Sequence, residues 1–449
     1  MALENVLRNM GVVGAGGAGF PTHIKVANKC EVVIGNGAEC EPLLYNDKYI
    51  MEEAGEEVVK GLELVMQSTD AKKGVIALKK KYLSIAGNLE KTIAEKKNIS
   101  LFLLEDYYPV GDEFILIQEI TGKVIPQGRI PPDLGCLVNN VETLRNVYRA
   151  EKGKAVTRRT LTCIGEVKKP SIITARIGTS FREIINLCEP TLEDFAVIVG
   201  GPMMGGVVFD LDTPVIKTTS GILVLPKDHP LVLKKTMRIE YIIKQSKAAC
   251  CQCSYCTDLC PRYLLGHELY PHKIMRQINF GIDLPYEVIQ NAFLCSECGL
   301  CEVFACPMDL SPRIINQKIK ANLLAAGYQP KFSGEKENSR EEREEREERA
   351  ERAYRKIPSS RIKNRLRLDK YDEDGRRPLR VIETDPDQVE ILLKQHTGVP
   401  SEAVVKINEP VNEGDLIAEI PKEKLGARLH SSIKGRITYI DEERIIIKK

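Results

Sequence analysis

The pattern of apolar and polar positions divides the chain into parts with different periods. In residues 1–155, apolar runs at 31–36, 74–78 and 99–105 predict buried strands. Apolar positions three and four apart predict helices over 52–68 and 112–121. Strands that alternate with helices are typical of an α/β layer with a partly parallel sheet. We therefore expect residues 1–155 to form an α/β domain.

The pattern shortens over residues 156–235. Four strand-like runs lie at 159–167, 171–178, 195–201 and 221–226. One helix is predicted over 180–188, with Ser180 as its N-cap and Glu183 at the capping-box position. This mixture predicts a small α+β domain.

The last three parts are helical, charged and β-rich in turn. Residues 236–330 read as helices, and Pro312 and Gly327 bound a predicted helix there. Residues 331–380 include E-E-R repeats, which predict a linker or a solvated helix, with a partner-binding helix as the alternative. Residues 381–449 hold short strand runs and a turn at 412–415, which predict an all-β module.

Composition narrows the class of protein. Apolar residues make up 43% of the 449 positions, charged residues 29%, and the net charge is +2, so no strong field points to nucleic acid. No apolar run reaches the roughly 20 residues that a membrane span needs, and the first residues lack the apolar core of a signal peptide. We therefore expect a cytoplasmic protein, in which disulfides are rare. Its 14 cysteines need another explanation.

Two cysteine runs supply that explanation. One run has the spacing C-x2-C-x2-C-x3-C-P and the other C-x2-C-x2-C-x4-C-P. In two-cluster ferredoxins the fourth cysteine of each run ligates the other cluster. We therefore predict two [4Fe–4S] clusters, one on Cys250, Cys253, Cys256 and Cys306, the other on Cys295, Cys298, Cys301 and Cys260. Zinc, the alternative, favours two C-x2-C pairs and fits these runs badly. Cys251 lies outside the pattern and is expected to be a small buried residue.

A glycine-rich loop, GVVGAGGAGFPTHIK at 11–25, is the second candidate site. Its glycines at 14, 16 and 19 have G-x-G-x-x-G spacing, and Glu39 lies 20 positions after the last of them. A dinucleotide fingerprint follows a strand, and only GVV precedes this one. Glycines let backbone amides approach a phosphate or a flat ring. A dinucleotide loop, a flavin loop and a flexible turn all remain open on spacing alone.

Four ordered stretches carry a family resemblance. GAGGAGFPTHIK resembles the flavin loop of the NADH-binding subunit of respiratory complex I, and GNGAECEP (35–42), PVGDEFILIQEITG (109–122) and VNNVETL (138–144) resemble its later loops. With the cysteine runs, the chain is similar to the RnfC family over nearly its whole length except the E-E-R segment. The resemblance implies a flavin domain, a β-grasp domain of the SLBB type, a ferredoxin-like segment and a lipoyl-like barrel-sandwich module.

The resemblance also implies cofactors and their residues. It implies that FMN binds and that NADH stacks on it, with contacts from Gly14, Gly16, Gly17, Gly19, Lys25, Asn36, Glu39, Glu41, Asp112, Glu113, Asn139, Asn140 and Thr143. Two residues depart from the complex I pattern: Ala15 stands in place of an arginine, and Asp112 in place of a glutamate. Lys434 lacks the sequence around a lipoyl lysine, so an assembly or docking role is expected for the last module.

The implied function is electron transfer from NADH through FMN and two clusters to a redox partner. The module order favours the cobalamin reductases of the family, whose acceptor is a corrinoid. The alternative is a non-enzymatic RnfC-like carrier that docks between a donor and a reductase such as proline reductase. Ferredoxin as the donor, a homo-oligomer, membership of a larger complex, a bacterial microcompartment and the periphery of a membrane complex all stay open.

Overall fold

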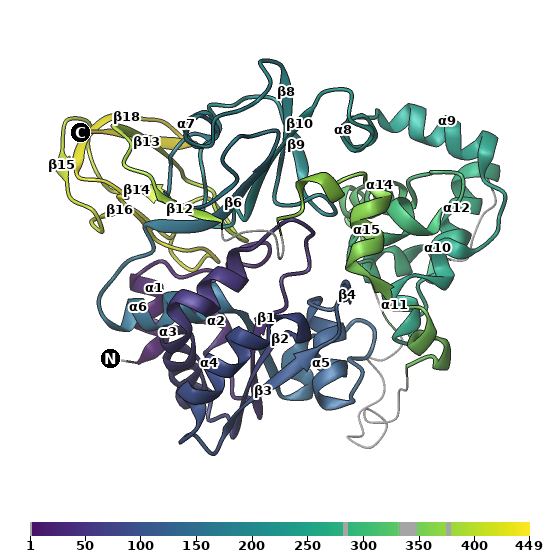
Figure 1. The fold of residues 1–449 in the computed structure, drawn as a ribbon, viewed down its shortest axis with the longest axis horizontal. Helices are drawn as coiled ribbons and strands as arrows, with labels where there is room; N and C mark the ends of the chain where they lie inside the picture. Colours follow the sequence, from purple (N-terminus) through teal and green to yellow (C-terminus); the bar gives the residue numbers. More distant parts are fainter. Residues whose placement is uncertain (1, 282–285, 331, 333–347, 374–378) are drawn as a thin grey trace.

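The computed structural model describes residues 2–281, 286–330, 332, 348–373 and 379–449. Figure 1 shows a lower α/β body in purple and blue, a teal β body above it, a helical body at the right and a yellow β module at the left. The two ends of the chain lie on the same side.

The first body is built on a parallel sheet in the order β3-β2-β1-β5. Its strands are β1 (Val32–Gly37), β2 (Lys73–Lys79), β3 (Ile99–Leu104) and β5 (Cys136–Asn140). Its main helices are α3 (Asn46–Ser68), α4 (Leu83–Ile93), α5 (Glu113–Thr121) and α6 (Val141–Glu151). The strands predicted at 31–36, 74–78 and 99–105 and the helix at 112–121 are confirmed. Helix α3 begins at Asn46, earlier than the predicted residue 52.

Alternating strand residues bury both faces of this sheet. Val33 packs in one core with α3, α4 and α6, whereas Ile34 packs in another with α5. Strand β1 lies between β2 and β5, so the chain leaves it toward opposite sides of the sheet. In open α/β sheets, ligands bind in the crevice outside the carboxyl ends of the strands at such a point. Here those ends are Gly37 and Asn140.

A six-stranded mixed sheet, in the order β12-β7-β6-β10-β8-β9, forms the second body. Its strands are β6 (Arg158–Gly165), β7 (Ser171–Arg176), β8 (Phe195–Val199), β9 (Gly206–Val208), β10 (Gly221–Pro226) and β12 (Arg380–Glu383). Helix α7 (Phe181–Leu187) packs on this sheet, and the Ser180 side chain accepts a hydrogen bond from Glu183 N, as predicted. The mixed α+β character is confirmed. Strand β12, predicted within the last module, instead pairs in parallel with β7.

Short helices make up the cysteine-bearing body. They are α8 (Pro230–Lys235), α9 (Ile239–Ala249), α10 (Tyr255–Asp258), α11 (Pro261–Leu264), α12 (Pro271–Phe280), α13 (Tyr286–Ile289) and α14 (Pro312–Ala325). Ile242, Ile274 and Ile315 share its apolar core. Helix α14 matches the prediction for 312–327 to within two residues.

The predicted linker over 331–380 is wrong for the part that the structure describes. Residues 348–373 include β11 (Ile357–Pro358) and α15 (Ser359–Arg365), and β11 pairs with β4 (Tyr107–Tyr108). Ile362 and Leu368 are fully buried in a core shared with Leu223. The E-E-R repeats at 334–347 lie outside the described residues.

The last module is a sandwich of two small sheets, as its all-β pattern predicts. One sheet holds β13 (Gln388–Leu392), β15 (Pro410–Val411), β18 (Gly435–Ile440) and β19 (Arg444–Lys448), and the other β14 (Glu402–Ala403), β16 (Leu416–Glu419) and β17 (Leu429–His430). Its core is continuous with that of the first body.

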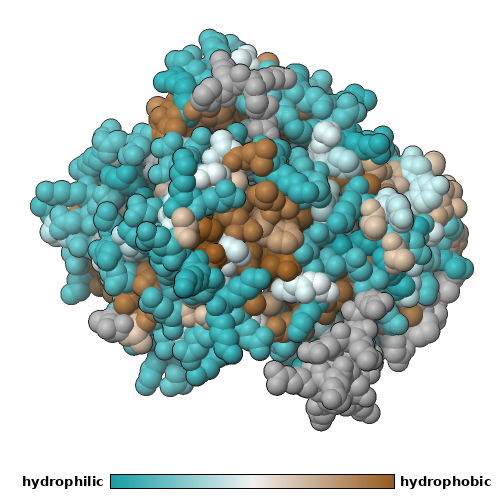
Figure 2. Space-filling model, turned by 60° about the horizontal axis from the view of Figure 1, so that its bottom comes forward, coloured by the Kyte–Doolittle hydropathy of each residue, from teal (hydrophilic) through white to brown (hydrophobic). Residues whose placement is uncertain are grey.

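The surface mixes polar and apolar residues. Figure 2 shows a mostly polar face on which apolar residues gather near the centre. Among the described residues, no helix is both long enough and apolar enough to pass through a bilayer.

Candidate functional site

A cavity of ≈ 540 Å³ lies at the carboxyl ends of β1 and β5. All thirteen residues predicted to contact FMN line it. The cavity also takes residues that the sequence did not single out: Asp47, Arg159, Gly200, Met204, Thr218, Ser220 and Ser296. Its volume is typical of a small-molecule or cofactor site. The second body and the second cysteine run therefore help to wall a cavity that the first body begins.

The glycine loop forms one wall, and it is not a dinucleotide fingerprint. It follows helix α1 (Leu3–Asn9) rather than a strand, and a bridge between Val13 and Pro21 closes it before α2 (Thr22–Lys25). Gly19 has a φ of +74°, and a Cβ there would lie 2.9 Å from the Thr218 side chain. A Cβ on Gly17 would meet nothing within 4 Å. Gly19 is thus required for packing between domains, while Gly17 leaves open space over the backbone.

Helix α6 holds this loop from below. Ala15 N donates to Thr143 Oγ1 at 2.9 Å. The Asn140 side chain caps α6 by accepting from Glu142 N at 2.8 Å. Its Nδ2 donates to both carboxylate oxygens of Asp47, at 3.0 and 2.9 Å. These side chains shape the cavity wall through bonds within the protein.

Arg159, on β6, joins the loop to the second body. Its guanidinium donates to Ala15 O at 3.0 Å and to Thr219 O at 2.7 Å, and it pairs with Glu142. Arg159 is 4% exposed. No pattern in the sequence indicates this role, because the arginine lies in a different domain from the loop it holds.

Three predicted carboxylates are also engaged with the protein. Glu41 accepts from Met203 N at 2.8 Å and Met204 N at 2.7 Å. Asp112 caps α5 through Oδ1, and its Oδ2 accepts from the Arg262 guanidinium at 2.9 Å. Lys25 Nζ donates to Glu113 Oε1 at 3.2 Å and to Val138 O at 3.1 Å.

Burial changes the acidity of the carboxyls in the cavity. It raises the pKa of Glu39 well above its usual range, and the nearby Asp47 carboxylate adds to that shift. Burial likewise raises the pKa of Asp47, to about 6. A carboxyl that holds its proton does not repel an anion. The cavity is therefore less negative than its count of acidic residues suggests.

The residues present fit a flat ring with an anionic tail. Asn139 Nδ2, at the cavity wall, is buried and has no hydrogen-bond partner in the protein. A buried donor of this kind costs free energy unless a ligand accepts from it. Together with the open space at Gly17 and the cavity volume, this orphaned donor supports the predicted flavin site. Asn36 serves the fold instead, because its Nδ2 donates to Gly111 O at 2.9 Å.

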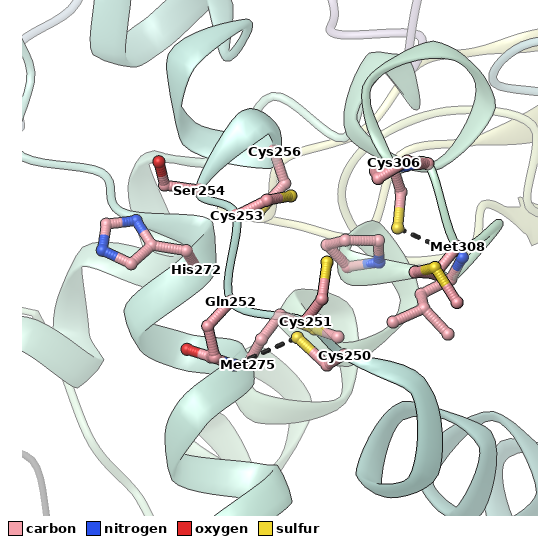
Figure 3. A pocket seen from close by; sticks show the side chains of 13 residues that line it. Cys250, Cys251, Gln252, Cys253, Ser254, Cys256, His272, Met275, Cys306 and Met308 are labelled. Carbon is pink, nitrogen blue, oxygen red and sulfur yellow. Dashed lines mark hydrogen bonds between the residues drawn. The ribbon is translucent and has the colours of Figure 1, made fainter.

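The first cysteine run lines a separate cavity with the last cysteine of the second run. Cys250, Cys253, Cys256 and Cys306 surround it, and Figure 3 shows their side chains around the same space. Cys251 lines it too and is exposed, so the expectation that it is buried is wrong. The structure thus brings together the first predicted set of four ligands.

The second predicted set is also brought together. The nearby Cys295, after burial, raises the pKa of the Cys260 thiol, and Cys298 acts in the same direction. Burial and then Cys295 raise the pKa of Cys301. Thiols must lose their protons to bind metal. Cys301–Ala305 forms a π-helical turn, which absorbs the extra residue of the C-x4-C spacing.

The two runs share one backbone shape. Gln252 and Ser254 have φ values of 58° and 64°, and the matching residues of the second run, Glu297 and Gly299, have 59° and 81°. These left-handed residues turn each chain around a central space. Among the described residues, no three His, Cys, Asp or Glu side chains converge as ligands of a single metal ion. The spacing therefore fits an extended cluster better than a single zinc ion.

The second run adjoins the flavin cavity. Cys298 lines that cavity, and Tyr108 Oη donates to Cys298 O at 2.6 Å. The first run lines its own cavity, away from the glycine loop.

Family comparisons agree with this division. Residues 7–149 match the Nuo51 FMN-binding domain, 249–311 a 4Fe–4S dicluster domain, and 374–449 the RnfC barrel sandwich hybrid domain. The predicted FMN and iron–sulfur cofactors are confirmed at the level of domains. An FMN domain and a dicluster domain on one chain make it an electron-transfer oxidoreductase. The SLBB type of the second body stays a prediction.

Curated relatives cover the chain to different extents. The cobalamin reductase PduS of Salmonella typhimurium is 40% identical over 98% of this chain and 95% of its own length. The RnfC-type component of the Na(+)-translocating ferredoxin:NAD(+) oxidoreductase complex of Acetobacterium woodii is 37% identical over 59% of this chain and 58% of its own. A solved NAD+-reducing [NiFe]-hydrogenase has a TM-score of 0.50 at 19% identity, covering 73% of this chain and 62% of the other, which shows a shared fold.

Proposed function

The chain belongs to the family of the PduS cobalamin reductases, and we propose that it transfers electrons from NADH, through its flavin cavity and two cysteine-lined sites, to a corrinoid. The likeness to PduS spans 98% of this chain, which supports a shared acceptor. A cytoplasmic location and a redox partner protein that presents the corrinoid are parts of the same proposal, since cluster cysteines must stay reduced.

One observation carries the proposal. The cavity that holds all thirteen predicted flavin contacts also has Cys298 on its wall. A hydride acceptor in that cavity would therefore lie beside a ligand of the second cluster. When bound, FMN supplies the conversion of a hydride into single electrons, and the clusters carry those electrons.

The side chains have distinct roles in this proposal. The backbone at Gly14–Gly17 and the Asn139 amide face the flavin, while Thr143 and Asn140 fix the loop that carries those glycines. Met204, 54% exposed, lines the cavity from the second body and borders the space left for the nicotinamide. Lys25 and the start of α6 supply positive potential for a phosphate.

The test begins with the protein purified without oxygen. We expect one FMN per chain, about eight irons, and bleaching of the flavin and cluster absorption on stopped-flow mixing with NADH. Added cobalamin should then restore that absorption as it is reduced. The variant Asn139→Ala should retain less FMN and keep its iron. Asn186→Ala, at an exposed position on α7, should match the wild type.

Two outcomes would contradict the proposal in different ways. Eight irons without flavin and without a response to NADH would leave a docking electron carrier. Bleaching by NADH that cobalamin does not reverse, even at high concentration, would remove the corrinoid and keep the NADH oxidoreductase.

A further inference from the structure

The cavity of the first cysteine run holds one cysteine more than a four-ligand cluster uses. Cys251 lines it beside Cys250, Cys253, Cys256 and Cys306. Figure 3 shows the Cys251 sulfur directed between Cys253 and Cys306, into the space that the other cysteines surround. Hydrogen-bonding reach between the Cys251 and Cys253 thiols agrees with this direction.

Cys250 has a different orientation. Its Sγ accepts a hydrogen bond from Gln252 Nε2 at 3.0 Å, and Figure 3 shows it turned toward that side chain. The left-handed residue Gln252 folds the chain back directly after this pair. As a result, two adjacent cysteines lie at the same edge of one cavity, and spacing alone selects Cys250.

The second run is a natural comparison within the same chain. Its backbone has left-handed residues at the same two positions, but the residue that matches Cys251 is Ser296. The two sites therefore share a loop shape and differ in whether a spare thiol follows the first ligand.

We propose that Cys251 is an alternative ligand of the first cluster, able to take the place of Cys250. In the exchange, the Cys251 sulfur binds the iron as its thiol releases a proton, and the Cys250 thiolate leaves the iron and takes up a proton. No electron is transferred, and the cluster keeps four thiolates throughout. The inference rests on the proposed ligand assignment, not on the electron donor or acceptor.

The cavity itself makes this exchange local. Cys251 is exposed, so its sulfur can move without displacing a packed core. The other three ligands, Cys253, Cys256 and Cys306, hold the cluster from different elements while one position changes. The second site has no equivalent thiol next to Cys295.

The test compares iron content and cluster spectra of variants purified without oxygen. We expect Cys250→Ser and Cys251→Ser each to retain about eight irons per chain. The double variant Cys250→Ser/Cys251→Ser should lose about half of its iron and one of the two sets of reduced-cluster EPR signals. Cys295→Ser, which has serine beside it, should lose the other set by itself.

Two results would overturn the inference. If Cys250→Ser alone lost as much iron as the double variant, Cys251 would not replace it. If the double variant kept all its iron, the ligand assignment on which the inference rests would be wrong. The signal of the second cluster serves in every variant as the check that the chain has folded.

Discussion

At the scale of single residues, the polar side chains around the flavin cavity divide into those already bonded and those still open. Asp112 uses both carboxylate oxygens, one to cap α5 and one to hold Arg262. The Asn139 Nδ2 donor, by contrast, has no partner in the protein. A carboxylate that caps a helix and holds an arginine acts on a cofactor through the position of its loop, whereas an orphaned donor acts on it directly.

Asp112→Ala should destabilise the protein by about 3 kcal/mol, because it removes a helix cap and leaves a mostly buried arginine without its carboxylate. Arg262 is 9% exposed and stacks on the Phe114 ring at 3.8 Å, so it cannot easily reach water. An anaerobic urea titration followed by circular dichroism would measure the change in unfolding free energy.

An exposed pair of the same chemistry is the control. Asp212 accepts from the Arg182 guanidinium at 2.7 and 3.1 Å, and both side chains are at least half exposed. Asp212→Ala should change the unfolding free energy by less than about 0.5 kcal/mol. Equal losses in the two variants would show that burial of the Asp112 pair contributes nothing.

At the scale of elements, the sequence predicts what local periodicity and chemistry constrain. Strands β1, β2 and β3 were predictable because buried parallel strands read as continuous apolar runs. The start of α3 was not, because its first turn buries the polar residues Asn46 and Asp47. The pairing of β12 with β7 could not be predicted, since its partner lies some 200 positions earlier in the chain.

The candidate site follows the same division. The cysteine runs and the glycine loop are readable because cluster chemistry and close backbone approach fix their spacing. Arg159 and the loop at 200–206 come from another domain, and nothing near them in sequence marks the cavity they line. Their contribution is visible only when the domains are packed together.

The loop at 200–206 should loosen when Glu41 is lost. Glu41 accepts from two of its amides, while Lys235 Nζ donates to Met203 O at 3.1 Å and Gly205 O at 2.6 Å on the same loop. In Glu41→Ala, hydrogen exchange of the Met203 and Met204 amides should accelerate about tenfold or more, the equivalent of losing a hydrogen bond to a charged group. Mass spectrometry of the peptide over this loop would measure the rate.

The matched variant is Asp210→Ala. Asp210 bonds Asp212 N in an exposed turn and does not bond the 200–206 loop. Exchange at Met203 and Met204 should be unchanged there. Unchanged exchange in Glu41→Ala as well would mean that Lys235 alone fixes the loop.

At the scale of the whole molecule, three bodies converge on the glycine loop. Arg159 holds Ala15 from the second body, and Lys217 Nζ donates to Gly11 O at 2.7 Å and to Arg428 O at 2.8 Å. The last module adds Thr397, whose N donates to Gly19 O at 3.2 Å and whose Oγ1 donates to Ala18 O at 2.9 Å. The barrel-sandwich module therefore has a structural role beside the flavin cavity, in addition to the docking role expected from sequence.

This arrangement predicts that a substitution in the last module weakens FMN binding in the first. Thr397→Val keeps the shape of the side chain and the backbone bond to Gly19 but removes the hydroxyl bond to Ala18. Loss of one hydrogen bond of about 1 kcal/mol should raise the dissociation constant of FMN about fivefold if the loop must be ordered to bind it. Thr438→Val, which removes an exposed hydroxyl bond to Ile446 O within the same module, should not. Fluorescence titration of the flavin-free protein with FMN would measure both constants, with iron content as the check on folding. Equal constants would mean that the glycine loop is ordered without the last module, and that Thr397 only fastens the two bodies together.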